Sequence, residues 1–192
     1  FADPLELRGD SQLGVPGLLE ATRRGRVAVV NPIGAAVLEN PGLVPFLGDA
    51  ARLLLGEDAV LASPQTWWCG DSGARSHVLT HLEDLAIKPI SRAHAPTRYG
   101  WLLSAAERAD LAARIAAEPW AWCGQEPLPL STAPVVTRAG LEPRRFVLRT
   151  FGVAHDNDYT FLPGGLGRVA ASADEYTVAN YRGALAKDVW VL

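Results

Sequence analysis

Methionine is absent from all 192 residues, so the sequence shows no initiator residue at its start. Residues 1–6 also lack the basic beginning and the apolar stretch that a secretory signal requires. No segment approaches the run of roughly 20 apolar residues that crosses a bilayer. We therefore expect a globular protein without a membrane partner, and a piece cut from a longer polypeptide.

Cysteine is nearly as rare, since Cys69 and Cys123 are the only two. Two cysteines in a chain of this length do not make the disulfide framework of a secreted protein, so the expected location is a reducing cytoplasm. Each cysteine follows a tryptophan, and neither adjoins a basic residue that would stabilise a thiolate. Both are therefore predicted to be buried, unreactive thiols.

Lysine is scarce as well, because Lys88 and Lys187 are the only lysines beside sixteen arginines. The formal net charge is −3, and the basic residues are scattered along the chain. A protein that follows a nucleic-acid backbone carries clustered basic residues instead. We therefore expect no nucleic-acid partner, and a lysine inside an apolar segment becomes conspicuous.

What is present is a globular composition, with 48% hydrophobic and 20% charged residues. Residues 1–83 mix helix and strand signals, and we interpret them as an α/β segment. Gly56 is the expected end of the helix that precedes it. The elements predicted in this part are helices at 16–25, 43–55 and 74–82 and a buried strand at 27–30.

From residue 84 onward the pattern is one helix among several strands. Ser104 and Glu107 have the spacing of a capping box, which predicts the start of a helix over 104–117. The polar residues 155–158 predict a hairpin turn, and the glycines 164–165 predict a bend. The predicted strands are 85–89, 120–123, 135–137, 146–154, 159–162, 167–171 and 189–192. The expected fold class is α+β, ending in a mostly antiparallel sheet.

Lys88 lies on an apolar strand that Pro89 terminates. An ammonium group is costly to bury without an anionic partner, so the lysine is expected to reach a cleft. A polar loop and then the capped helix follow, an order that can hold phosphate although no Walker A motif is present. The alternative is a lysine whose stem lies on the protein while its amine reaches solvent.

Residues 124–128 follow a predicted strand and begin a proline-rich connection that extends to Pro134. Such a hinge can offer backbone donors and acceptors to a flat base. A connection with no binding role is the alternative.

Arg149 alternates with Val147 on its strand, and Arg168 follows the glycine-rich segment. Two arginines on neighbouring strands could clamp a polyphosphate. Alternatively, they could form structural ion pairs with Glu126 or Asp188.

His77 and His81 have the i, i+4 spacing of metal ligands on a helix. The glutamate of a His-Glu-x-x-His motif is missing, so no metal site is expected there. A zinc hydrolase built on these histidines is the disfavoured third hypothesis.

Taken together, several stretches resemble the circularly permuted ATP-grasp proteins of type 2. The likeness runs in one order through nearly the whole chain, which makes it more specific than any single motif. The stretches that carry it are 3–8 with 13–19, 31–34 with 37–39, 66–70, 87–89, 125–126 with 130–134, 163–166 with 168–169, and 187–192.

The resemblance implies partial, circularly permuted ATP-grasp lobes, with residues 1–83 as a preceding linker region and 84–192 as the nucleotide-binding lobe. It implies an ATP-dependent ligase that converts a carboxylate to an acyl-phosphate for attack by an amine. By this likeness Lys88 contacts the ATP phosphates. The adenine hinge implied by the likeness comprises Gln125, Glu126 and Leu128. Arg149 and Arg168 face the phosphates or the acyl-phosphate, where fixed positive charge is worth most.

Two departures from the family pattern are visible. The region near Asn40 has no second phosphate lysine, and the loop after Lys88 is poor in glycine. They motivate the alternative function, a binding or scaffolding module without turnover.

The resemblance also implies magnesium, whose aspartate and asparagine ligands are expected in a segment before Phe1. We therefore expect the rest of a parent chain as a partner, and no ligase activity from these 192 residues alone.

Overall fold

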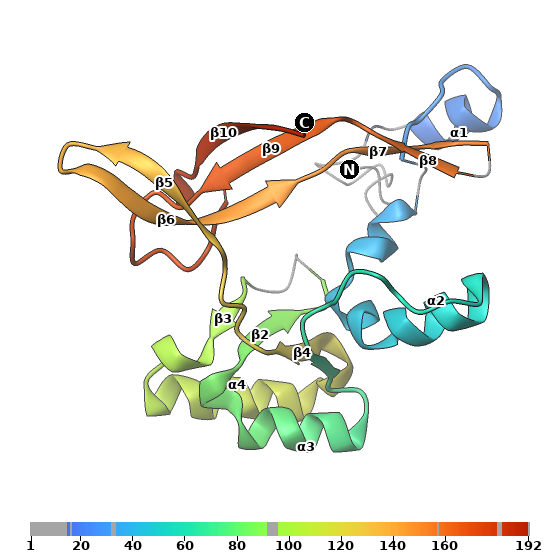
Figure 1. Cartoon of the computed structure of the whole chain (residues 1–192). Coiled ribbons are helices and arrows are strands. Elements are labelled where there is room, and N and C mark those ends of the chain that lie inside the picture. Colours follow the sequence, from blue (N-terminus) through green and yellow to red (C-terminus); the bar gives the residue numbers. More distant parts are fainter. Residues whose placement is uncertain are drawn as a thin grey trace. The chain divides into compact units, whose positions relative to one another are not determined.

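The computed structural model describes residues 15, 17–31, 34–91, 96–156, 158–179 and 182–191. They belong to two compact units, residues 1–127 and 128–192 (Figure 1). All strand pairings in the described ranges are antiparallel. The helices of the described ranges belong to the first unit. The predicted α+β class is therefore confirmed.

The first described elements are helical. They are α1 (Leu18–Arg23), η1 (Ala35–Glu39), η2 (Pro41–Phe46) and α2 (Leu47–Leu55), where η denotes a 3-10 helix. The predicted helix at 43–55 is thus α-helical only from Leu47, because Pro45 inside η2 has no amide hydrogen to donate. Gly56 ends α2 in a left-handed conformation, as expected.

The strand predicted at 27–30 is wrong. These residues form no strand, and Val30 is 87% exposed rather than buried. A short apolar run has no period of its own, and no strand in the described part of the chain pairs with it.

The first unit contains a four-stranded sheet with the order β1-β4-β2-β3. The strands are β1 (Thr66–Trp68), β2 (Ala86–Pro89), β3 (Arg98–Tyr99) and β4 (Trp122–Gln125). The predicted strand at 120–123 begins later because Pro119–Ala121 form the 3-10 turn η5, with proline at its first position.

Two helices, α3 (Ser72–Thr80) and α4 (Ala105–Ala117), lie together below this sheet in Figure 1. Short 3-10 turns, η3 (Leu82–Asp84) and η4 (Gly100–Leu102), connect them to the strands. The buried core of the unit lies between helices and sheet and consists of Cys69, Val78, Leu82, Leu85, Ile87, Leu111, Ile115, Ala121 and Trp122. None of the helices in the described ranges is long and apolar enough to cross a membrane.

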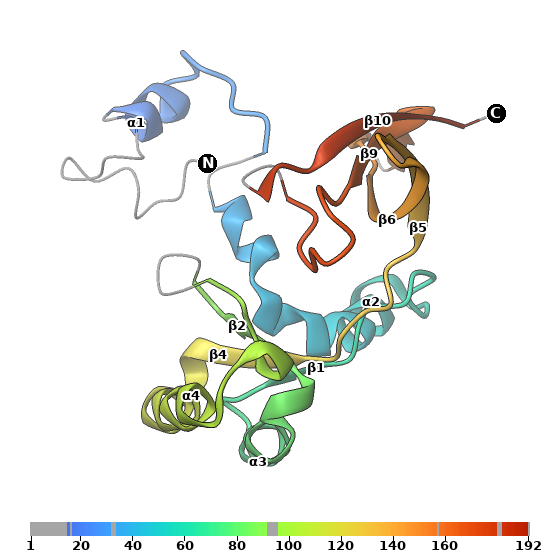
Figure 2. The ribbon, with the colours of Figure 1, turned by 90° about the vertical axis from the view of Figure 1, so that its left-hand side faces the viewer.

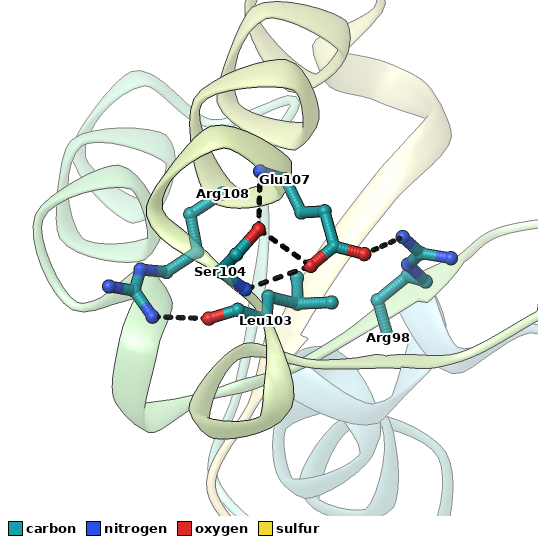
Figure 3. A network of polar contacts seen from close by, with 5 residues as sticks. All are labelled: Arg98, Leu103, Ser104, Glu107 and Arg108. Atoms are coloured by element: carbon teal, nitrogen blue, oxygen red, sulfur yellow. Dashed lines mark hydrogen bonds and ion pairs between the residues drawn. The ribbon is translucent and has the colours of Figure 1, made fainter.

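The predicted capping box at the start of α4 is confirmed (Figure 3). The Ser104 hydroxyl accepts from the Glu107 amide at 3.3 Å, and the Glu107 carboxylate accepts from the Ser104 amide at 2.8 Å. The hydrogen bonding from Ser104 to the Glu107 carboxylate lowers the pKa of Glu107. Arg98 of β3 lies 3.8 Å from the same carboxylate, so the cap also links the helix to the edge strand.

The second unit contains a sheet with the order β10-β9-β6-β5, which curls in Figure 2. Its strands are β5 (Thr132–Thr137), β6 (Gly140–Arg149), β9 (Gly164–Val169) and β10 (Leu185–Trp190). The predicted hairpin is confirmed by β7 (Gly152–His155) and β8 (Asp158–Phe161). The predicted strand at 146–154 is therefore two strands, interrupted at 150–151.

The bend predicted at Gly164 and Gly165 is wrong, because both residues belong to β9 and pair with β10. Glycine is needed there for close strand approach. A Cβ atom on Gly165 would lie 2.7 Å from the Arg149 carbonyl oxygen.

The two compact units meet in the sequence after Pro127, whereas the predicted boundary between linker region and nucleotide-binding lobe lies at 83/84. That position falls inside the first unit, within the 3-10 turn η3. The functional division at 83/84 stays a prediction.

We expect Ser104→Ala to lower the free energy of unfolding by about 1 kcal/mol, because it removes the acceptor that caps α4. Denaturant unfolding measures the effect. Ser76→Ala is the matched control, since this exposed serine of α3 bonds only to the Ser72 carbonyl and should change stability little. Equal stabilities of the two variants would contradict the capping role.

Gly100→Ala is expected to lower the free energy of unfolding by about 3 kcal/mol, because overpacking here meets backbone that cannot move aside. A Cβ atom at Gly100 would lie 1.7 Å from the Leu82 carbonyl oxygen. Gly48→Ala is the control, since the nearest atom is an Arg52 side-chain nitrogen at 4.0 Å. A Gly100→Ala variant as stable as Gly48→Ala would refute this packing.

Candidate functional site

The four-stranded sheet of the first unit has two different faces. Successive side chains on a strand point to opposite faces, and directly paired residues share a face. Ile87 pairs with Gly124, and both lie on the face that α3 and α4 cover. Lys88, which pairs with Cys123, therefore lies on the opposite face.

The Lys88 ammonium is half-buried and bonded to a neutral group. Its Nζ atom donates to the Gln125 amide oxygen, Oε1, at 2.5 Å. No carboxylate lies within ion-pair distance of it among the residues that the structure describes. Burial lowers the pKa of Lys88. Lys88 is thus neither a surface lysine directed to water nor one half of a salt bridge.

Gln125 is 7% exposed, and the protein uses both ends of its side-chain amide. Oε1 accepts from Lys88, and Nε2 donates to the Thr66 hydroxyl at 3.0 Å. Both ends of the amide thus have a partner in the protein, and the adenine role predicted for Gln125 stays a prediction.

Glu126 fixes the end of β4 to the segment before β1. Its amide donates to the Gln65 carbonyl at 3.0 Å, and its carboxylate accepts from the Gln65 amide at 2.8 Å. Leu128, which is 51% exposed, begins the second unit within an extended connection that ends at β5. The side chain of Glu126 is therefore structural here, and its backbone carbonyl is the group left for the predicted hinge.

Arg149 and Arg168 lie on one face of the second sheet. Arg168 pairs with Val147 and Arg149 pairs with Leu166, so the two arginines are diagonal neighbours on β6 and β9. Neither forms an ion pair with a described residue of the second unit, so the alternative pairing with Asp188 is absent there.

The predicted site residues are therefore divided between the units. Lys88, Gln125 and Glu126 belong to the first unit, in one sheet and its immediate continuation. The residues of the second unit are Leu128, Arg149 and Arg168.

Two polar residues near these groups were missed by the sequence argument. Thr66 bonds to Gln125, and nothing in the local sequence marks its hydroxyl. Arg145 shares its face with Arg149, and alternation along the strand would have indicated it. Its guanidinium donates to the Glu175 carbonyl at 3.2 Å and lies 4.5 Å from the Tyr176 ring.

The histidines of α3 form an aromatic stack. The rings of His77 and His81 are 4.3 Å apart, and Trp67 lies 4.2 Å from His77. Within the described ranges no three histidine, cysteine or acidic residues are grouped so that they could hold a metal ion.

The prediction of buried thiols is confirmed. Cys69 and Cys123 are both free and fully buried. Burial raises the pKa of Cys69 to about 11 and that of Cys123 to about 12. Neither thiol is therefore a nucleophile near neutral pH.

Comparison with known families identifies the family of this chain. The family model "Circularly permuted ATP-grasp type 2" matches residues 1–170. The chain belongs to this family. ATP-grasp proteins generally bind ATP and are ligase-like.

Other proteins are similar to this ATP-grasp chain over its whole length. An uncharacterized protein of Mycobacterium tuberculosis is 44% identical over 100% of the chain, which covers 21% of that relative. An uncharacterized protein of Synechocystis is 35% identical, and the chain covers 40% of it. An uncharacterized protein of Mycobacterium leprae is also 35% identical, and the chain covers 34% of it. The chain thus spans about a fifth to two fifths of these relatives.

The described residues of this ATP-grasp chain fit an anionic group at Lys88, because the ammonium lacks an acidic neighbour there. They do not fit magnesium, since no cluster of carboxylates or other ligands is found in the part of the chain described. No described residue is therefore assigned to a metal.

The thiols give a pH-dependent prediction. Their pKa values are raised above the ordinary value of 9.0, so folding favours the protonated form. Their contribution to stability is complete below pH 9 and is lost as the pH rises through about 11 and 12. We expect the unfolding free energy of the chain to fall more steeply above pH 9 than that of a Cys69→Ala, Cys123→Ala variant.

Denaturant unfolding at each pH measures the difference, and a thiol reagent at pH 8 should react only after unfolding. Rapid reaction of the native chain at that pH would contradict the burial of both thiols.

Proposed function

We propose that the chain is the nucleotide-binding portion of an ATP-dependent ligase that joins a carboxylate to an amine. The observation that carries the proposal is the half-buried Lys88 ammonium, held by a neutral amide with no acidic neighbour in the described residues. In a chain of this family, such an uncompensated charge is suited to phosphate oxygens.

The proposed reaction has two steps. A substrate carboxylate oxygen attacks the γ-phosphorus of ATP, which forms an acyl-phosphate and releases ADP. A substrate amine then attacks the acyl carbon, the phosphate leaves, and the amine loses a proton as the amide forms. Lys88 would hold the phosphate oxygens in line for the first step, where positioning and fixed charge supply most of the catalysis.

Arg149 and Arg168 are proposed to stabilise the phosphoryl or acyl-phosphate group. Their diagonal placement on one sheet face supports a two-arginine clamp, because both guanidinium groups lack an ion-pair partner in the described chain. An arginine fork can donate two parallel hydrogen bonds to one phosphate.

The hinge proposed for adenine uses backbone groups at Gln125, Glu126 and Leu128. Both ends of the Gln125 side chain and the carboxylate of Glu126 are engaged by the protein, which leaves main-chain atoms for the base. Magnesium would supply positive charge that neutralises the ATP phosphates, and its ligands are proposed to lie outside residues 1–192. We propose a cytoplasmic location for the complete protein.

The test is calorimetric titration of ATP into the complete polypeptide that contains this chain. We expect Lys88→Ala to weaken ATP binding at least about tenfold, the equivalent of one charge-assisted hydrogen bond. Lys187→Ala is the matched control, because the Lys187 amine is bonded to the Pro134 carbonyl in the second unit. Equal affinities of the Lys88→Ala variant and its parent would refute the phosphate role.

Arg149→Lys supplies a second test, on turnover rather than binding. Amide formation from ATP, magnesium and mixed acids and amines is expected to slow at least about a hundredfold, because lysine cannot replace a planar fork. Arg138→Lys, in the turn between β5 and β6, is the control. If the parent binds ATP but forms no product with any acceptor, the binding-module alternative replaces the ligase.

A further inference from the structure

We propose that Gln125 and Thr66 are positioning residues, which hold the Lys88 ammonium in place through a chain of hydrogen bonds ending at the Pro64 carbonyl. The inference deepens the proposed function, because it rests on Lys88 as the phosphate-binding group.

This series of hydrogen bonds contains three bonds, which can run in only one direction. Lys88 Nζ donates to Gln125 Oε1 at 2.5 Å, and Gln125 Nε2 donates to Thr66 Oγ1 at 3.0 Å. The Thr66 hydroxyl donates in turn to the Pro64 carbonyl at 3.0 Å. An ammonium only donates and a carbonyl only accepts, so both ends are fixed. Rotating the Gln125 amide by 180° would direct its donor at another donor.

Burial makes this direction energetically important. Thr66 and Gln125, each 7% exposed, are the buried polar residues of the described core. A buried polar group without a partner destabilises the fold, because its lost hydrogen bonds to water are not replaced. Here the two residues satisfy each other, and they pair directly across β1 and β4. The amide oxygen is therefore held at one place, aimed along the sheet face toward Lys88 on β2.

A neutral amide has a different effect from a carboxylate at this position. A glutamate would also hold the ammonium, but it would cancel the charge that a phosphate needs. Glutamine fixes the amine and leaves its charge uncompensated. Consistent with this, burial lowers the pKa of Lys88, and the group that partly opposes the effect is the Cys123 thiol rather than a carboxylate. The site therefore combines a restrained lysine with a full positive charge for an anion.

The restraint also reduces the entropic cost of binding. A free lysine side chain loses much of its rotamer entropy when it is ordered. In this fold, the hydrogen bond to Gln125 orders much of the Lys88 stem before a ligand arrives.

The decisive variant is Gln125→Glu in the complete polypeptide, which keeps the side-chain size and exchanges the amide for a carboxylate. The Lys88 pKa is read from the side-chain carbon resonances in NMR, which are assigned by comparison with Lys88→Arg. We expect Gln125→Glu to raise the pKa of Lys88 by about one unit or more. ATP affinity should fall at least about tenfold although Lys88 is unchanged.

Thr66 is tested with a pair of variants. Thr66→Val keeps the shape and removes the hydroxyl, so it leaves the Gln125 amide nitrogen without its acceptor and is expected to weaken ATP binding about tenfold. Thr66→Ser keeps the hydroxyl and should restore parental affinity. Thr80→Val, which removes an exposed hydroxyl of α3 bonded to the Ser76 carbonyl, is the control for threonine-to-valine exchange.

The outcomes separate this inference from the proposed function. If ATP affinity depends on Lys88 but its titration is the same in Gln125→Glu and the parent, the positioning chain is refuted. If the Lys88 titration responds to Gln125→Glu but ATP affinity is independent of Lys88, the positioning chain stands and the phosphate role fails. An equal loss of affinity in Thr66→Ser and Thr66→Val would also refute the role of the hydroxyl.

Discussion

The first unit depends on the strict alternation of side chains along the central strand β4. Trp122 and Gly124 face the helices, while Cys123 and Gln125 face the other way. Helix α3 approaches so closely that a Cβ atom on Gly124 would lie 2.7 Å from Val78. This tight apolar layer fixes the register, and the register in turn determines which polar groups meet on the opposite face. A shift of one residue would exchange the two sets completely.

Most of the fold was accessible from the sequence where a signal is local. The capping box at Ser104, the strand containing Lys88 and the hairpin of the second unit depend on neighbours in the chain, and all three are correct. Residues 27–30 failed because a short apolar run cannot specify a partner strand. The glycines 164–165 failed because local sequence does not distinguish a turn from close contact between strands.

The candidate site was only partly predictable for the same reason. Lys88 was conspicuous because an isolated cation on an apolar strand is unusual. The role of the Gln125 amide was not visible, since it depends on Thr66, which is 59 positions away in the chain. Glu126 likewise uses its carboxylate on Gln65, a contact between strands distant in sequence. The roles implied by the resemblance stay predictions, and the structure adds the side-chain contacts of Gln125 and Glu126.

The environment of Lys88 also has a consequence for its covalent chemistry. Desolvation favours the uncharged amine, and an uncharged amine carries the lone pair that attacks electrophiles. The partial burial of Lys88 thereby makes its amine more reactive toward acylating and carbonyl reagents than that of a lysine surrounded by water. Modification there would abolish the charge while leaving the apolar layer beneath the sheet intact.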